Sequence, residues 1–340
     1  MKDKRKLNIH YIILVLMLCT VKFNFAQEIK FTGYGSTGYI FYDRDILNGY
    51  NQETYFEGKL QTAIKINKKI EAQLDMRGNS VEEAIELREF SIKLEYFDNL
   101  KFKIGNIKRP FGNEYTTNRE DLYTVQRSYV QEQISWLGYG VRTVSLMGYY
   151  NYSKKRPDFP YTYAVSIFRD NNLTSGVAGR FLYHPSELSY GINYTYQSKG
   201  GDVPVKTHGF AVEAGLDVED YESSLQIFYL QNPEEEIFQQ LLGKDEKVIA
   251  FGATFTNAVE FDIHGSFIES IQPVLLLSYY VPNFDKKENH VLQVLTGANF
   301  YLDKDVRIRF NADLRMTKNE FNEDYSTKNS RAIFEVQVKF

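Results

Sequence analysis

The sequence contains very little cysteine, tryptophan or proline. Among 340 residues there are one cysteine (Cys19), one tryptophan (Trp136) and 8 prolines. A single cysteine cannot build a disulfide framework or a cysteine-ligated metal site. These two classes of protein are therefore excluded.

The sequence also lacks any hydrophobic run long enough for a transmembrane helix. The longest apolar stretch, residues 11–19 (YIILVLMLC), is shorter than the ~18 residues that such a helix needs. It follows a basic segment and precedes a plausible cleavage site after Ala26, which is the arrangement of a secretory signal peptide. We predict a signal peptide over residues 1–26, with an uncleaved anchor as the alternative.

Removal of the signal peptide would change the chain's charge and chemistry. It takes away five basic residues and one acidic residue, so the net charge moves from −4 to −8. It also removes Cys19, which leaves no thiol nucleophile. Export without a membrane helix leaves the periplasm, the outer membrane or secretion as destinations.

Aromatic residues, by contrast, are abundant. The chain has 25 phenylalanines and 26 tyrosines, yet its mean hydropathy is negative. This combination is typical of a barrel with an apolar outer surface and a wet interior.

Alternation of polar and apolar residues dominates the chain after Gln27. Residues 306–316, for example, alternate without a break between apolar and polar side chains, as expected of a strand with two different faces. We predict an all-β fold, a closed antiparallel transmembrane β-barrel of sixteen strands over residues 27–340. The predicted strands are 29–44, 55–66, 70–77, 87–97, 100–109, 138–150, 159–169, 176–184, 189–199, 206–218, 221–231, 248–260, 267–281, 290–302, 306–316 and 330–340.

The connections support this interpretation. Those after even-numbered strands are mostly short and those after odd-numbered strands mostly long, as expected for periplasmic turns and extracellular loops. Residues 234–242 (EEEIFQQLL) predict a short helix in one long loop. Three glycines in the first strand, beginning with Gly33, indicate a bulge or a close backbone approach. Pro273 is expected near a strand end because proline cannot donate to the ladder.

The last ten residues, 331–340 (RAIFEVQVKF), form an amphipathic strand that ends on an aromatic residue. We expect this strand to close the barrel by pairing with both the preceding strand and the first one. Phe340 resembles the terminal signal by which the barrel assembly machinery recognises outer-membrane barrels. Outer-membrane lipid is then the expected surrounding of the chain.

The longest connection, residues 110–137, follows a motif at the end of the fifth strand. The segment 105–114 (GNIKRPFGNE) is similar to the G-x-x-K-x-P-F-G-x-E signature of the phosphate-selective porin O and P family. The matching residues are Gly105, Lys108, Pro110, Phe111, Gly112 and Glu114. The resemblance implies a porin, an extended loop at 110–137 that folds into the lumen as a constriction, and a homotrimer.

Charged side chains on the polar faces of the strands bear on solute selectivity. Twelve basic and ten acidic positions fall there, although the mature chain is acidic overall, which predicts a mild anion preference. We expect these side chains to line the pore or its constriction: Lys101, Lys103, Lys108, Arg109, Glu114, Arg119, Arg127, Arg307, Arg309 and Arg315. For the last three, an ion-paired ladder with Glu335 or Asp313 is an equally good interpretation.

The sequence gives little support for an enzymatic function. Four histidines follow the signal peptide, at 184, 208, 264 and 290, and none lies in a nucleophile motif. No metal-ligand spacing, phosphate loop or nucleotide fingerprint occurs, so no cofactor and no nucleic-acid partner are expected. We predict a passive channel for small, preferentially anionic solutes. A plugged barrel with an adhesion or assembly role and a barrel hydrolase are the alternatives.

Overall fold

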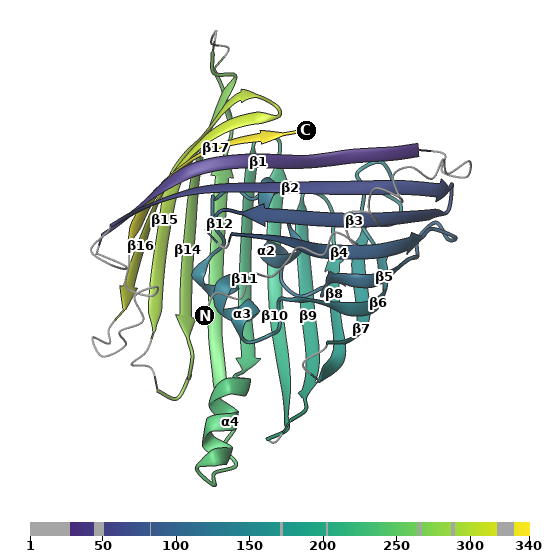
Figure 1. The fold of residues 1–340 in the computed structure, drawn as a ribbon, viewed down its shortest axis with the longest axis vertical. Helices are drawn as coiled ribbons and strands as arrows, with labels where there is room; N and C mark the ends of the chain where they lie inside the picture. Colours follow the sequence, from purple (N-terminus) through teal and green to yellow (C-terminus); the bar gives the residue numbers. More distant parts are fainter. Residues whose placement is uncertain are drawn as a thin grey trace, which may run out of the picture.

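A computed structural model describes residues 28–43, 51–81, 83–170, 173–201, 203–263, 265, 267–286, 290–317 and 330–340. The predicted signal peptide (1–26), and with it Cys19, lies outside these residues. The described strands form one antiparallel sheet that closes on itself, as Figure 1 shows. The predicted fold class, a closed barrel of sixteen long strands, is confirmed.

Each strand pairs with its neighbours in the sequence. The strands are β1 (Glu28–Tyr42), β2 (Gln52–Asn67), β3 (Ile70–Asn79), β4 (Ala84–Leu94), β5 (Lys101–Lys108), β6 (Arg142–Tyr150), β7 (Tyr161–Arg169), β8 (Thr174–Tyr183), β9 (Leu188–Lys199), β10 (Val205–Val218), β11 (Tyr221–Gln231), β12 (Ile249–Val259), β13 (Phe261–Asp262), β14 (Ser270–Val281), β15 (Val291–Asp303), β16 (Val306–Thr317) and β17 (Arg331–Lys339). The two-residue β13 only extends the β12–β14 hairpin, so the barrel has sixteen long strands.

Pro273 lies within β14 rather than near its end. The β12–β14 ladder stops at Val274, and pairing resumes between Ile271 and Phe261 of β13. Proline lacks a backbone N–H, so it fits this gap in the ladder. The expected position was therefore wrong, although the physical reason for it holds.

β1 and β17 meet at the seam of the barrel. β17 pairs with β16 on one edge and with β1 on the other, as expected. Beyond the last strand, the Phe340 N–H donates to the carbonyl of Gly33 (3.0 Å), and the Gly33 N–H donates to the carbonyl of Phe340 (2.9 Å). A Cβ atom on Gly33 would lie 2.1 Å from the carbonyl oxygen of Lys59, so only glycine fits at this close approach.

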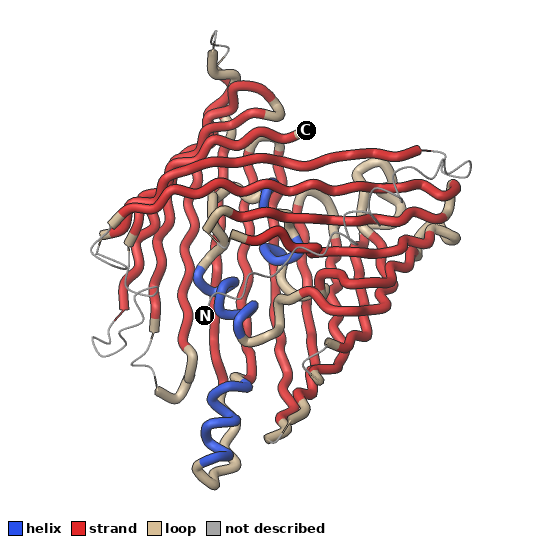
Figure 2. The backbone as a smooth tube through the Cα atoms, in the orientation of Figure 1, coloured by secondary structure: helices blue, strands red, loops and turns tan. Residues whose placement is uncertain are grey.

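The two rims differ in the length of their connections (Figure 2). On one, the short-turn rim, the connections 68–69, 219–220 and 304–305 are tight. On the other, the long-loop rim, the chain makes the extended connections 109–141 and 232–248. This difference between the rims has two exceptions. The connection 170–173 on the long-loop rim is short, and the connection 151–160 on the short-turn rim is long.

The two faces of the wall have opposite character. In β10 to β12, Phe210, Val212 and Tyr229 are exposed on the outer face, while Gln226 and Thr254 are buried on the inner one. An outer surface of large exposed apolar side chains and a polar interior are typical of a barrel in lipid.

Short helices occupy two long-loop connections. The segment between β5 and β6 contains α2 (Asn113–Thr116), the 3-10 helix η1 (Arg119–Asp121) and α3 (Tyr129–Trp136). The connection between β11 and β12 contains α4 (Pro233–Leu241), close to the helix expected at 234–242. No helix in the described residues is long and apolar enough to cross a membrane.

Candidate pore and inner loop

Residues 109–141, which we call the inner loop, lie inside the ring of strands. Backbone N–H groups of the loop donate to side chains of the wall, among them Gly112 to Asn193 Oδ1 (3.1 Å), Val125 to Asn311 Oδ1 (2.7 Å) and Tyr129 to Gln293 Oε1 (2.7 Å). These acceptors belong to β9, β16 and β15. The inner loop therefore crosses the lumen from one side of the barrel to another.

The motif at 105–114 provides the turn into the lumen. Gly105 has a φ of 141°, and a Cβ there would lie 2.0 Å from the Phe90 carbonyl oxygen, so β4 and β5 approach closely. Gly112 has a φ of 79°, which favours glycine. Lys108 Nζ donates to the carbonyls of Thr116 (3.2 Å) and Thr117 (3.1 Å) at the end of α2. The motif residues thus hold the loop's first turn.

Glu114 joins the two halves of the inner loop. Its carboxylate accepts hydrogen bonds from the backbone N–H and the hydroxyl of Ser128, the N-cap of α3. Burial raises the pKa of Glu114, and the nearby Arg127 guanidinium partly offsets this. Burial also lowers the pKa of Arg127. Glu114 is therefore a structural link within the loop, and it does not line the main cavity described below.

An apolar cluster closes one half of the lumen. Phe111 from the start of the inner loop and Val130 and Ile134 from α3 are fully buried against the wall. Their partners on the wall are Ala211, Phe228, Leu230, Ala250, Tyr280 and Val291. Burial of this surface stabilises the loop in one position.

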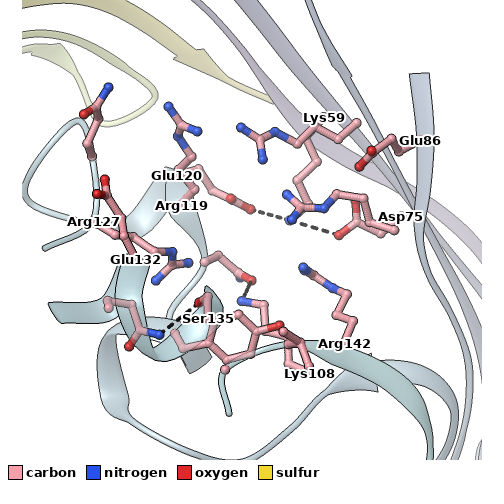
Figure 3. Close-up of a pocket in the computed structure, with 18 of the residues that line it drawn as sticks. Lys59, Asp75, Glu86, Lys108, Arg119, Glu120, Arg127, Glu132, Ser135 and Arg142 are labelled. Carbon is pink, nitrogen blue, oxygen red and sulfur yellow. Dashed lines mark hydrogen bonds and ion pairs between the residues drawn. The ribbon is translucent and has the colours of Figure 1, made fainter. Parts of the chain in front are cut away.

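The other half of the lumen holds a polar cavity of about 1030 Å³, which we call the main cavity (Figure 3). It lies between the inner loop and strands β2 to β6, with Arg331 of β17 at its edge. Its basic lining residues are Lys59, Arg77, Arg88, Lys108, Arg119, Arg127, Arg142 and Arg331. Its acidic lining residues are Asp75, Glu86, Glu120 and Glu132. Basic side chains therefore outnumber acidic ones on the lining of the main cavity, eight to four.

A second cavity of about 370 Å³, the turn-side cavity, continues the main cavity toward the short-turn rim. Lys93, Asn151 and Thr162, near the short-turn ends of their strands, contribute to its lining. The two cavities share Asp75, Lys108 and Asn118. These shared residues mark the place where the two cavities adjoin beside the inner loop.

Four of the eight bases of the main cavity have close ion-pair partners. Lys59 pairs with Glu120 (2.6 Å) and Asp75 (3.7 Å), and Arg119 pairs with Glu57 (2.9 Å). Arg77 also pairs with Glu57, while Arg331 pairs with Asp313 (3.0 Å).

Two guanidinium groups of the main cavity have no close acidic partner. Within the described residues, the Arg88 guanidinium forms no hydrogen bond or ion pair, and Arg142 has only Glu89 at 3.9 Å. Lys108 and Arg127, which also line the main cavity, likewise form no ion pair within the described residues.

Arg88 faces the lumen because β4 bulges. Asp75 of β3 pairs with Glu89, but Met76 pairs with Leu87, so Arg88 is the extra residue. The carbonyl left over at Arg88 accepts a hydrogen bond from Asn106 Nδ2 (2.9 Å). Regular alternation would have placed Arg88 beside Phe90 on the outer face, and a bulge redirects such a side chain. Sequence alternation could not reveal this residue.

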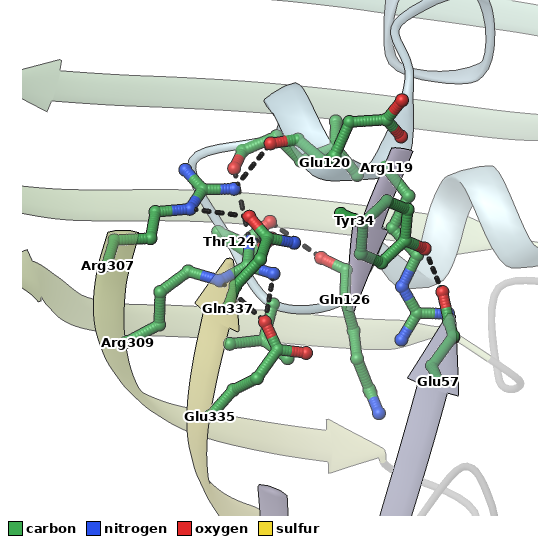
Figure 4. Close-up of polar contacts among 12 residues, drawn as sticks. Tyr34, Glu57, Arg119, Glu120, Thr124, Gln126, Arg307, Arg309, Glu335 and Gln337 are labelled. Carbon is green, nitrogen blue, oxygen red and sulfur yellow. Dashed lines mark hydrogen bonds and ion pairs between the residues drawn. The ribbon is translucent and has the colours of Figure 1, made fainter. Parts of the chain in front are cut away.

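Besides Glu114, four more predicted pore residues lie at buried positions outside the two cavities. Arg307, Arg309 and Arg315 face the lumen side of the wall, but the inner loop covers them, and none lines the main or the turn-side cavity. Arg309 Nε donates to Glu335 (2.9 Å), as Figure 4 shows, and Arg315 Nε donates to Asp313 (3.1 Å). The ion-paired ladder, stated as the alternative, describes Arg309 and Arg315, whereas Arg307 donates to the side-chain oxygen of Gln337 (2.9 Å) and to the carbonyl of Glu120 (2.7 Å).

Arg109, the fourth, lies at the base of the inner loop. Its side chain is fully buried, its guanidinium stacks on the Phe168 ring (3.6 Å) and it donates to the carbonyl of Gly138 (2.6 Å). Burial lowers the pKa of Arg109 to about 10, and Asp170 partly offsets the shift. Its contacts with the wall and with the loop's end are structural.

The remaining predicted residues are spread along the route. Lys108, Arg119 and Arg127 line the main cavity, and Lys103, paired with Glu89, lines the turn-side cavity. Lys101 pairs with Glu95 (2.9 Å) at the short-turn rim and lines neither. The candidate pore residues predicted from the sequence did not include Lys59, Arg77, Arg88, Arg142 and Arg331. Alternation places Lys59, Arg77 and Arg331 on the polar face, whereas β6, which carries Arg142, does not alternate cleanly.

The three described histidines each contact a different tyrosine. His184 stacks on Tyr152 (4.6 Å between ring centroids), His208 contacts Tyr194 and His290 contacts Tyr279. His264 lies outside the described residues. No group of three or more His, Cys, Asp and Glu side chains suited to a metal ion occurs in the part of the chain that the structure describes.

Comparisons with known proteins bear on the fold. No protein-family model and no curated protein matches the sequence. Among solved structures, OmpF of Salmonella typhi, in complex with daunomycin, has 12% identity, a TM-score of 0.68 and coverage of 94% of this chain and 99% of that one. OprB of Pseudomonas putida has 12% identity, a TM-score of 0.64 and coverage of 92% and 94%. The anion-selective porin of Comamonas acidovorans has 9% identity, a TM-score of 0.63 and coverage of 92% and 99%. The chain therefore has the barrel fold of general bacterial porins, and a specific relationship to the phosphate-selective family is not confirmed.

Proposed function

We propose that this chain is an outer-membrane porin, through which small solutes diffuse passively and anions are favoured over cations. The observation that carries the proposal is the polar route formed by the main cavity and the turn-side cavity. The two meet at Asp75, Lys108 and Asn118, so the route runs beside the inner loop toward both rims. In this account residues 110–137 form the constriction and the apolar cluster fixes its position.

The preference for anions follows from the balance of charge along the route. Eight basic and four acidic side chains line the main cavity, and fixed charge in a pore biases which ions enter it. Arg88, Lys108 and Arg127 form no ion pair in the part of the chain that the structure describes, and Arg142 has only a long one with Glu89. A phosphate preference, which the motif resemblance implies, belongs to this proposal and requires its own test.

The location of the chain follows from its surface and its first residues. Exposed apolar side chains on the outer face of a closed sheet suit a lipid bilayer, and the predicted signal peptide would direct export. Assembly would use Phe340 as the recognition signal for the barrel assembly machinery. A homotrimer, implied by the resemblance, is tested by sedimentation or native mass measurement in detergent.

Planar bilayer recordings of the purified, refolded protein test the proposal. Stable unitary conductance steps are expected, because the polar route is not crossed by the apolar cluster. A barrel plugged by its inner loop, the alternative that the apolar cluster favours, would give no steady open-channel current. If phosphate does not block the conductance, the phosphate preference is contradicted, but the proposal of a general channel is not.

A further inference from the structure

A third cavity lies on the long-loop side, next to the main cavity. This vestibule cavity has a volume of about 530 Å³. It shares Ser135, Val141 and Arg142 with the main cavity, so the two adjoin. The rest of its lining comes from Arg109, Trp136, Leu137, Gly138, Asp170, Thr174, Gln197, Lys199, Pro233 and Glu234. A solute that approaches the main cavity from this rim has the vestibule cavity beside it.

Trp136 gives the vestibule cavity an apolar surface. It is the only tryptophan of the chain and the last residue of α3. The opposite side of α3 is anchored by Val130 and Ile134, which are fully buried, but Trp136 is 66% exposed. The indole of Trp136 is therefore not part of the buried packing that holds the inner loop. A flat aromatic face in a polar cavity is suited to stacking on the apolar face of a ring.

Two arginines give the same cavity unsatisfied hydrogen-bond donors. Arg109 Nη2 and Arg142 Nε are buried and donate no hydrogen bond. Their ion pairs are long, 3.7 Å from Arg109 to Asp170 and 3.9 Å from Arg142 to Glu89. The third base of the cavity, Lys199, already pairs with Glu234 at 2.9 Å. Guanidinium groups with free donors are suited to carboxylate and phosphate groups.

We propose that the vestibule cavity is a docking subsite for solutes that combine a six-membered ring with one anionic group. The ring stacks on Trp136, and the anionic group binds Arg142. Arg142 also lines the main cavity, so the docked anion is already at the entrance of the route. The inference rests on the proposed function and adds a solute class to it. A bare anion would leave Trp136 unused, and a neutral ring would leave Arg142 unused.

The single tryptophan makes binding directly measurable. The purified protein in detergent is titrated with glucuronate and with benzoate, and the fluorescence of Trp136 is recorded at constant ionic strength. Glucose serves as the ring without charge and acetate as the charge without a ring. A saturable change with glucuronate, benzoate or both is expected, and the arm that responds distinguishes a sugar ring from an aromatic one. An equal response to glucose or acetate, or no saturable response to any of the four, overturns the proposal.

Variants assign the contacts. Arg142→Gln is expected to raise the half-saturating concentration about tenfold, because a charge-assisted hydrogen bond is lost. Arg156→Gln, exposed on the short-turn rim and outside these cavities, is the matched control and should match the unmodified protein. A solute that docks in the channel is expected to interrupt the current briefly. These interruptions should be shorter in Trp136→Ala than in the unmodified protein. Unchanged binding in Arg142→Gln together with unchanged interruptions in Trp136→Ala would contradict the subsite.

The fluorescence titration does not depend on ion flow, so the two proposals fail in different ways. A conducting channel without a ring-anion response contradicts the subsite alone. A ring-anion response in a protein that never conducts contradicts the passive channel, while the binding site itself stands.

Discussion

Arg309 and Glu335 form a buried ion pair across the β16–β17 ladder, next to the seam of the barrel. The side chains are 0% and 1% exposed, and Arg309 also donates to the carbonyls of Leu122 (3.3 Å) and Thr124 (3.0 Å) in the inner loop. One guanidinium group therefore joins the last two strands to the loop. This arrangement suits a structural role better than an ion path.

Removal of one partner of this pair should destabilise the barrel. Arg309→Ala leaves the Glu335 carboxylate buried without its counter-ion, and we expect a loss of about 3–5 kcal/mol. Thermal unfolding in detergent, followed by gel mobility, measures the loss. The double variant Arg309→Met, Glu335→Met is the control, since it removes both charges and should be much less destabilised. A single variant as stable as the unmodified protein would contradict the structural role.

Replacement of Arg88 should reduce the anion preference of the channel. Arg88→Gln removes one unneutralised charge from the main cavity, and a unit charge at short range in water contributes ~0.5–1 kcal/mol. We expect the anion-to-cation permeability ratio to fall about twofold to fivefold, measured from reversal potentials. Arg156→Gln should leave the ratio unchanged. If both variants behave alike, Arg88 does not face the conducting route.

Two glycines of β1 should respond differently to the same substitution. Gly33→Ala places a methyl group 2.1 Å from the Lys59 carbonyl oxygen and close to the Phe340 ring, so a loss of more than about 3 kcal/mol is expected. Gly35→Ala meets no atom within 4 Å and should change stability by less than about 0.5 kcal/mol. Refolding yield and thermal unfolding are compared for both. Equal effects would contradict the described seam.

Phe340 should matter more for assembly in cells than for stability. Phe340→Ala keeps the two backbone hydrogen bonds to Gly33 and loses only an exposed ring. We expect a lower level of folded barrel in the outer membrane but near-normal unfolding of the refolded protein. A variant with normal levels in cells would contradict the assembly signal.

Glu114 should give the inner loop a pH-dependent stability. Burial raises its pKa in the folded protein above the ordinary value, so the folded state binds the proton more tightly than the unfolded state does. The free energy of unfolding should therefore increase as the pH falls through the range between the raised and the ordinary pKa. Glu114→Gln mimics the protonated form and should remove this slope. An unchanged slope in the variant would assign the pH dependence to other groups.

The sequence was a reliable guide to the wall and a weaker one to the lumen. Alternation such as that of 306–316 depends on the period of a strand, so it identified the strands, their two faces and the closing role of 331–340. It could not show which inward side chains another segment covers. Arg309 faces the lumen as predicted, but the inner loop buries it.

Arg88 and Arg142 were missed for local reasons. A single extra residue in β4 turns Arg88 from the outer face to the inner one, and no residue of that segment indicates the bulge in the sequence. Arg142 begins β6, where apolar and polar residues do not alternate cleanly, so its face could not be assigned. The motif at 105–114, by contrast, located the start of the inner loop because its glycines and Lys108 are needed by that turn.

The reversal potential of single channels in a KCl gradient tests the central claim most directly. The positive lining of the main cavity predicts a potential displaced toward the equilibrium potential of chloride, and less displaced in Arg88→Gln. A potential displaced toward that of potassium in the unmodified protein would contradict the account.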